Sequence, residues 1–180
     1  MIIRKTQQPS NYPSNSIYES YTESSSGVYN CNYINGLSSS FNIITGTANS
    51  GTIGATGSTS AHLGMAEENR IGNKLSVANG GIVIGKGVTK VKISANLNVQ
   101  IHAALNGMMS FHIFKNGTRI DSNYIVQEAA KYYYISIPIP TYILNVQEGD
   151  ILSLYMDTPV SCTLHNDMYG KTQMTVEVIG

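Results

Sequence analysis

The sequence predicts an all-β fold, an antiparallel jelly-roll sandwich preceded by an extended N-terminal arm. Three observations support this class. From about residue 73 onward, short segments of alternating apolar and polar residues are separated by turn signals. None of the intervening segments has the periodicity of an amphipathic helix. Charged residues are only 12% of the chain, whereas Gly, Tyr, Ser, Thr and Asn are abundant, a balance typical of β folds with many turns.

The first third of the chain has the composition of an arm. Residues 1–60 are rich in Ser, Thr, Asn, Gly and Tyr and contain only short apolar runs, so this stretch should not fold alone. Tyrosine supplies rigid amphipathic area suited to contact with another protein. The five tyrosines concerned are Tyr12, Tyr18, Tyr21, Tyr29 and Tyr33. We predict that residues 1–60 form an anchoring arm and linker and residues 61–180 the jelly-roll head.

The head sequence contains at least seven predicted strands. The clearest is residues 90–101, where apolar and polar residues alternate without a break, as in a sheet with one buried face. Asn79-Gly80 and Asn116-Gly117 each lie between two β-type runs and predict hairpin turns. Further strands are predicted at residues 132–139, 151–156 and 172–179.

Two of these strands carry apolar groups on both faces, and only one face can fill the core of the head. Each large apolar side chain left in water forgoes roughly 1.5–3 kcal/mol of burial, and patches of such side chains usually mark interfaces. We therefore expect a homo-oligomer. The alternative is that a long loop of the same chain covers these residues. The predicted interface residues are Tyr132, Tyr134, Leu152, Leu154 and Met156.

No motif predicts catalysis or cofactor binding. Residues 80–86 match most of a phosphate-binding loop, but Gly87 stands where Ser or Thr should bind magnesium, and a strand rather than a helix follows. The four histidines are not spaced as ligands on one element, so we expect no metal, although a histidine on an oligomer axis stays open. The two carboxylates of a glycosidase need only be close in space, so the sequence does not exclude hydrolysis of a glycosidic bond. The expectation is a protein that is not an enzyme.

Charge and cysteine usage limit the partners and the compartment. Lys plus Arg equal Asp plus Glu at 11 each, which leaves no electrostatic footprint for nucleic acid or an anionic membrane. The N-terminus lacks a signal-like apolar run, and no segment approaches the roughly 18 apolar residues of a membrane span, so we expect synthesis in the cytoplasm.

Cys31 and Cys162 match no metal or redox spacing. We expect two buried or unreactive thiols, and a disulfide between Cys31 and Cys162 is the alternative.

Three segments of the head resemble a known type of jelly roll. They are residues 85–94, residues 111–118 with a Lys-Asn-Gly hairpin, and residues 146–155 with a Glu-Gly-Asp turn before an apolar strand. Together they are similar to the tumour-necrosis-factor and complement-globular-head jelly rolls. The resemblance implies a trimer packed around a threefold axis and carries over no catalytic residue.

The arm resembles a different group of proteins. Residues 12–16 (Tyr-Pro-Ser-Asn-Ser) and residues 27–35 look like the lead-in of small fibre or decoration proteins of bacteriophages that infect Gram-positive bacteria. This resemblance implies a virion-surface protein, a head fibre or capsid decoration, whose arm binds a capsid or tail protein. The alternative is a tail receptor-binding protein that recognises a host cell-surface saccharide. A depolymerase is a third possibility.

Overall fold

The computed structural model describes residues 18–23, 29–35, 42–57, 59–129, 132–167 and 170–180. The chain divides into two units, residues 1–41 and residues 42–180. In the first unit, β1 (Tyr18–Glu23) and β2 (Tyr29–Asn35) pair in antiparallel fashion. Tyr12 lies outside the described residues, and the other four tyrosines of the predicted arm lie on β1 and β2. Their anchoring role stays a prediction.

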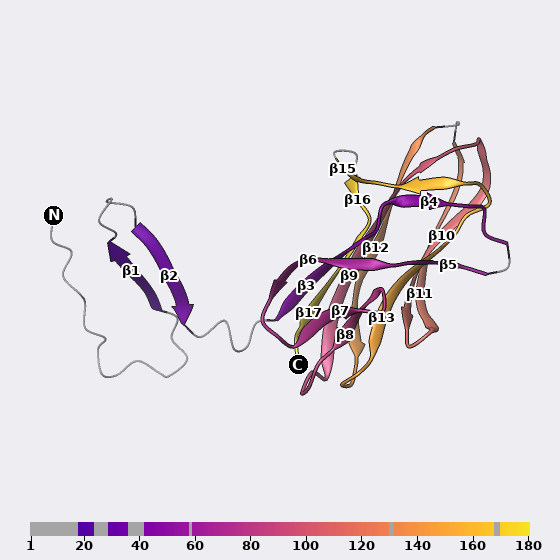
Figure 1. The fold of residues 1–180 in the computed structure, drawn as a ribbon. Helices are drawn as coiled ribbons and strands as arrows, with labels where there is room; N and C mark the ends of the chain where they lie inside the picture. Colours follow the sequence, from indigo (N-terminus) through magenta and orange to yellow (C-terminus); the bar gives the residue numbers. More distant parts are fainter. Residues whose placement is uncertain (1–17, 24–28, 36–41, 58, 130–131, 168–169) are drawn as a thin grey trace. The chain divides into compact units, whose positions relative to one another are not determined.

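The second unit, the head, is a sandwich of two antiparallel sheets (Figure 1). The β9 sheet has the strand order β4-β14-β9-β17-β3-β6, and β12 pairs with the other side of β9. Its strands are β3 (Ile43–Ala48), β4 (Gly51–Ile53), β6 (Met65–Ile71), β9 (Lys90–Ile101), β12 (Tyr134–Asn145), β14 (Cys162–Leu164) and β17 (Gln173–Val178).

The β13 sheet has the order β11-β10-β13-β8-β7, with β5 also pairing with β13. Its strands are β5 (Ala61–Leu63), β7 (Leu75–Ala78), β8 (Gly81–Ile84), β10 (Leu105–Lys115), β11 (Thr118–Ala129) and β13 (Ile151–Asp157). A short separate pair joins β15 (Asn166–Asp167) to β16 (Gly170–Lys171). Every pairing between strands is antiparallel, which confirms the predicted fold class. The described part of the chain contains no helix that could span a lipid bilayer.

The head begins earlier than the sequence predicts. The sequence composition places residues 42–60 in the arm, but β3 lies between β17 and β6 and pairs with both along its length. Ile44 and Ala48 of β3 are completely buried. β4 likewise pairs with β14. The boundary therefore falls between residues 41 and 42 rather than at residue 60.

The inward faces of both sheets fill the core. Three residues predicted at an oligomer interface belong to this core. Along β9, alternate residues are buried from Val91 to Ile101, as the sequence pattern predicts. Leu152, Leu154 and Met156 of β13 are also 0% exposed and belong to this core. Their assignment to an interface is corrected, because no surface of these side chains is left for a second subunit.

The opposite face of β13 carries a row of aromatic rings shared with the neighbouring strands β10 and β5. Tyr155 stacks on Phe114 of β10, with ring centroids 4.1 Å apart, and on His62 of β5, at 4.8 Å. The rings lie side by side in one sheet and keep exposed surface, because Tyr155 and Phe114 are half-buried and His62 is exposed.

The two turns that carry the resemblance of the head are joined to each other. Asn116 and Gly117 both have positive φ, as a two-residue hairpin turn requires. The Asn116 Nδ2 group donates to Oδ1 of the buried Asp150 at 2.7 Å, and the backbone N–H of Gln147 donates to Asp150 Oδ2 at 3.0 Å. Lys115 Nζ lies 3.1 Å from the same carboxylate. Burial opposes ionisation of Asp150, but these hydrogen bonds outweigh it and hold its pKa below the usual value.

Candidate interaction surfaces

The outward face of the β9 sheet is polar and carries few charges. Its central side chains are hydroxyls and carboxamides, here named the polar face: Thr45, Thr47, Ser94, Asn96, Asn98, Gln100, Thr163, Gln173 and Thr175. The register places Thr175 between Thr45 and Ser94, and the Thr45 and Thr175 hydroxyls share a hydrogen bond at 3.0 Å. Burying these uncharged groups at an interface costs less free energy than burying ions, provided that each group keeps a hydrogen-bond partner.

Two adjoining shallow hollows of about 440 and 190 Å³ indent the polar face, with Gln173 and Thr175 lining both. Glu68 stands at the wider one, where its carboxylate accepts hydrogen bonds from Lys171, Thr47 and Gln173. The bond from Lys171 is the main reason that the pKa of Glu68 is lowered. Because Lys171 pairs with the carboxylate, this hollow presents little net charge.

Several exposed apolar side chains lie along the margin of the head formed by β12 and the described part of β11. Ile143 is 66% exposed, Tyr134 39% and Ile120 37%. With the exposed Pro138 and Pro140, these side chains are here named the apolar edge. Proline cannot donate to a strand ladder, so a partner is expected to contact this edge through side chains rather than by adding a strand.

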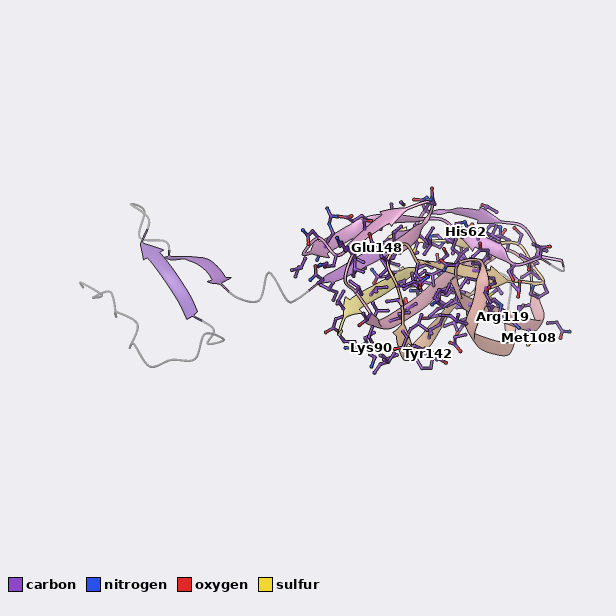
Figure 2. The ribbon with its side chains drawn as sticks, turned by 90° about the horizontal axis from the view of Figure 1, so that it is seen from below. His62, Lys90, Met108, Arg119, Tyr142 and Glu148 are labelled. Atoms are coloured by element: carbon purple, nitrogen blue, oxygen red, sulfur yellow. The ribbon has the colours of Figure 1, made fainter. Side chains whose placement is uncertain are left out.

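A hydrogen bond between Tyr142 and Asp121 joins β12 to β11 behind the apolar edge. The carboxylate of Asp121 accepts from the Tyr142 phenol, and this bond raises the pKa of Tyr142. Figure 2 shows the side chains of Tyr142 and Arg119, from β12 and β11, along the same margin of the head. The margin is therefore a joined surface of both sheets.

The end of the head opposite residue 42 carries an exposed tyrosine turn. Val178 N–H donates to Asn42, and β9 runs 12 residues from that end to Ile101, a span of roughly 36 Å. There Tyr132 and Tyr133 are 59% and 55% exposed. Tyr132 has a φ of 65°, a conformation that is unusual for a bulky residue.

Backbone contacts fix this turn on the end of β9. The Tyr132 N–H donates to the Ile101 carbonyl at 2.8 Å, and the Ile101 N–H donates to the Tyr133 carbonyl at 3.1 Å. Gln100 Nε2 donates to the Tyr132 carbonyl at 3.3 Å. Tyr132 and Tyr134, both predicted at an interface, are therefore exposed in one subunit but on different surfaces, the turn and the apolar edge.

One cluster has the residue types of a serine hydrolase but not the geometry. Ser110 Oγ and Asp157 Oδ2 each lie 2.8 Å from the same nitrogen of His112, Nε2. In a catalytic triad the acid instead binds Nδ1 and leaves Nε2 to the serine. Ser110 is 3% exposed and His112 0%, so a substrate could not reach them in this arrangement. The cluster is structural, and it was not foreseen from the sequence.

The segment that resembles a phosphate-binding loop lies in a β-hairpin. Residues 80–86 form a hairpin turn and β8, and the chain then enters β9, so no helix N-terminus faces them. Among the described residues, no three His, Cys, Asp or Glu side chains lie close enough to hold a metal ion. Cys162 is completely buried.

Comparisons with known proteins support the fold. Murine APRIL, solved at pH 8.0, superposes with a TM-score of 0.58 at 9% identity, covering 77% of this chain and 99% of that one. The Eiger TNF structure from S. frugiperda gives 0.58 at 6% identity, covering 78% and 93%. At identities this low the superpositions are evidence for the fold alone. They confirm the tumour-necrosis-factor type of jelly roll. No protein-family model and no curated protein sequence matches the chain.

Proposed function

We propose that the head forms a homotrimer and that the chain is a non-enzymatic structural protein of a bacteriophage surface, attached through the segment before residue 42. The observation that supports self-association is that the β9 sheet presents a neutral polar face, while the margin where β12 meets β11 presents an exposed apolar edge. Ile143 is 66% exposed, and full burial of such a side chain is worth roughly 1.5–3 kcal/mol.

The two surfaces differ, so contact between them is head-to-tail rather than symmetric. The apolar edge of one subunit lies on the polar face of the next, and a head-to-tail contact forms a ring when its rotation closes. Threefold closure is what the resemblance of the head to the tumour-necrosis-factor type implies. The polar face suits such an interface because several of its groups already form hydrogen bonds within the subunit: Thr45 with Thr175, Asn98 with the Lys171 carbonyl, and Gln173 with Glu68. An apolar edge can therefore cover these groups without leaving them unpaired.

The proposed setting rests on the resemblance of residues 12–16 and 27–35 to the lead-in of phage fibre and decoration proteins. In this setting the arm binds a capsid or tail protein and the head projects. The fragment of residues 42–180 should form trimers but should no longer join virions. Incorporation of that fragment into particles at the level of the full chain would contradict the anchoring role.

Light scattering of the full chain tests the trimer directly, and we expect three times the chain mass. Ile143→Ser should shift the population to monomer at micromolar concentration. The matched control is Met108→Ser, since Met108 is 53% exposed but lies on β10 opposite Val126, several residues along the ladder from Ile120 of the apolar edge. A monomeric wild-type chain, or an unchanged mass for Ile143→Ser, would overturn the proposed interface.

A further inference from the structure

We propose that the exposed turn of Tyr132 and Tyr133, together with His102 beside it, is a recognition site for a neutral saccharide. This site is here named the tyrosine tip. It lies at the end of the head opposite residue 42, where a projecting head would meet its surroundings. This site deepens the proposed function. It depends on the proposed trimer only for the number of sites, since a trimer would carry three of them.

The tyrosine tip is held in place before any ligand binds. Two backbone hydrogen bonds and the Gln100 carboxamide fix Tyr132 and Tyr133 on the end of β9. His102 is held through Nε2 by the Thr163 hydroxyl at 2.8 Å. Tyrosine has few rotatable bonds, so ordering these rings on binding costs little conformational entropy. A preformed surface of this kind loses little affinity to reorganisation.

The side chains at the tip match the chemistry of a sugar. The flat C–H face of a pyranose ring can stack on an aromatic ring, while its hydroxyls bond to phenol, carboxamide and imidazole groups. Tyr132 and Tyr133 supply rings with a polar handle. Gln100 bonds the Tyr132 carbonyl, and its register partner Thr163 bonds His102, so a carboxamide and an imidazole lie at the same end of β9. The contacts that fix the tip in the described part of the chain involve no charged side chain. A neutral sugar fits this set better than an anionic one.

The size of the tip favours a saccharide over a folded protein. A stable protein interface buries about 800 Å² per partner, whereas two exposed tyrosines provide on the order of 200 Å². A monosaccharide unit needs only one ring face and a few hydrogen bonds. In a trimer, three tips bind one repetitive polymer together, so weak single sites give high avidity.

The test uses the full chain on an array of neutral and acidic saccharides, followed by calorimetric titration with the saccharides that bind. We expect binding to neutral members, and Tyr133→Ser should weaken it roughly tenfold, the equivalent of ~1.4 kcal/mol. Tyr133→Phe keeps the ring and should stay within about threefold of the wild type. The control Ile71→Ser changes a side chain that is 48% exposed on β6, next to the opposite end, and should have no effect.

Two further measurements make the outcomes distinguishable. Lys131 precedes the turn in the sequence and lies outside the described residues. Lys131→Ala should leave binding unchanged, and a preference for acidic saccharides that this variant abolishes would overturn a neutral ligand. Light scattering on the same samples separates the two proposals. A trimer that binds no neutral saccharide, or binds equally after Tyr133→Ser, overturns the tyrosine tip alone, whereas a monomer overturns the proposed assembly.

Discussion

Asp150→Ala should destabilise the head, because this one carboxylate joins two turns that lie 34 residues apart. Its side chain is 2% exposed. It accepts hydrogen bonds from the Gln147 backbone at 3.0 Å and from Asn116 Nδ2 at 2.7 Å, and it pairs with Lys115 at 3.1 Å. Alanine removes all three interactions at once.

The expected cost is about 2–3 kcal/mol in the free energy of unfolding. Each lost hydrogen bond contributes about 1 kcal/mol. This is below the usual value for a charged acceptor, because Gln147 and Asn116 are exposed and water can replace the carboxylate as their partner. The side chain of Lys115 is 29% exposed, so its ion pair adds only about 0.2–1 kcal/mol. Asp150→Asn keeps one oxygen acceptor and should cost about half as much.

The measurement is urea unfolding at a single protein concentration, because oligomerisation couples to apparent stability. Glu148→Ala is the control: Glu148 is an exposed neighbour in the same turn, and its loss should stay within about 0.5 kcal/mol. A cost below that limit for Asp150→Ala, with an unchanged m value, would refute the reasoning.

The same residue gives a pH dependence with a defined sign. The pKa of folded Asp150 is lowered from 3.8, so unfolding raises its proton affinity. Its contribution is therefore present above about pH 3.8 and is lost as pH falls through the lower folded value. The stability difference between wild type and Asp150→Ala should shrink over that acidic range. A constant difference down to pH 2 would contradict a charged Asp150 in the folded head, because the unfolded carboxyl binds its proton below about pH 3.8.

Three further predictions concern the core. Leu154→Ala should cost about 2–5 kcal/mol by urea unfolding, since the side chain is 0% exposed; a cost under 1 kcal/mol would place it outside the core. Gly81→Ala should lower the unfolding midpoint by the equivalent of about 1–3 kcal/mol, because a Cβ there meets the Leu152 carbonyl at 2.8 Å; unchanged stability would show that the backbone yields. Burial raises the pKa of Cys162 to about 11, so in a Cys31→Ser chain a thiol reagent at pH 8 should label only the unfolded protein. Rapid labelling of the native chain would contradict this burial.

Much of the head could be predicted from the sequence because its strands have one buried face. Period-two alternation marks β9 and β17, and Asn-Gly marks both hairpin turns, since positive φ at two successive positions leaves few residue choices. These signals are local, and the structure confirms them.

The misplaced features depend on contacts between residues far apart in the sequence. β3 is short and lies in a polar stretch, and its stability comes from β17, about 130 residues later. For β13, the pattern shows two apolar faces but does not say what covers each one. Leu154 faces the core, and the half-buried Tyr155 contacts Phe114 and His62 on the opposite face. The turn of Tyr132 and Tyr133 was visible in the sequence only as a run of aromatic residues.

The position of β3 in its sheet also determines how the head responds to mechanical force. A pull applied at residue 42 and resisted at the opposite end runs along the strand. The hydrogen bonds of β3 to β17 and β6 lie across that direction. Such a load shears many bonds at once instead of opening them one after another. The head should therefore withstand tension along its strands better than a pull that peels β3 away sideways.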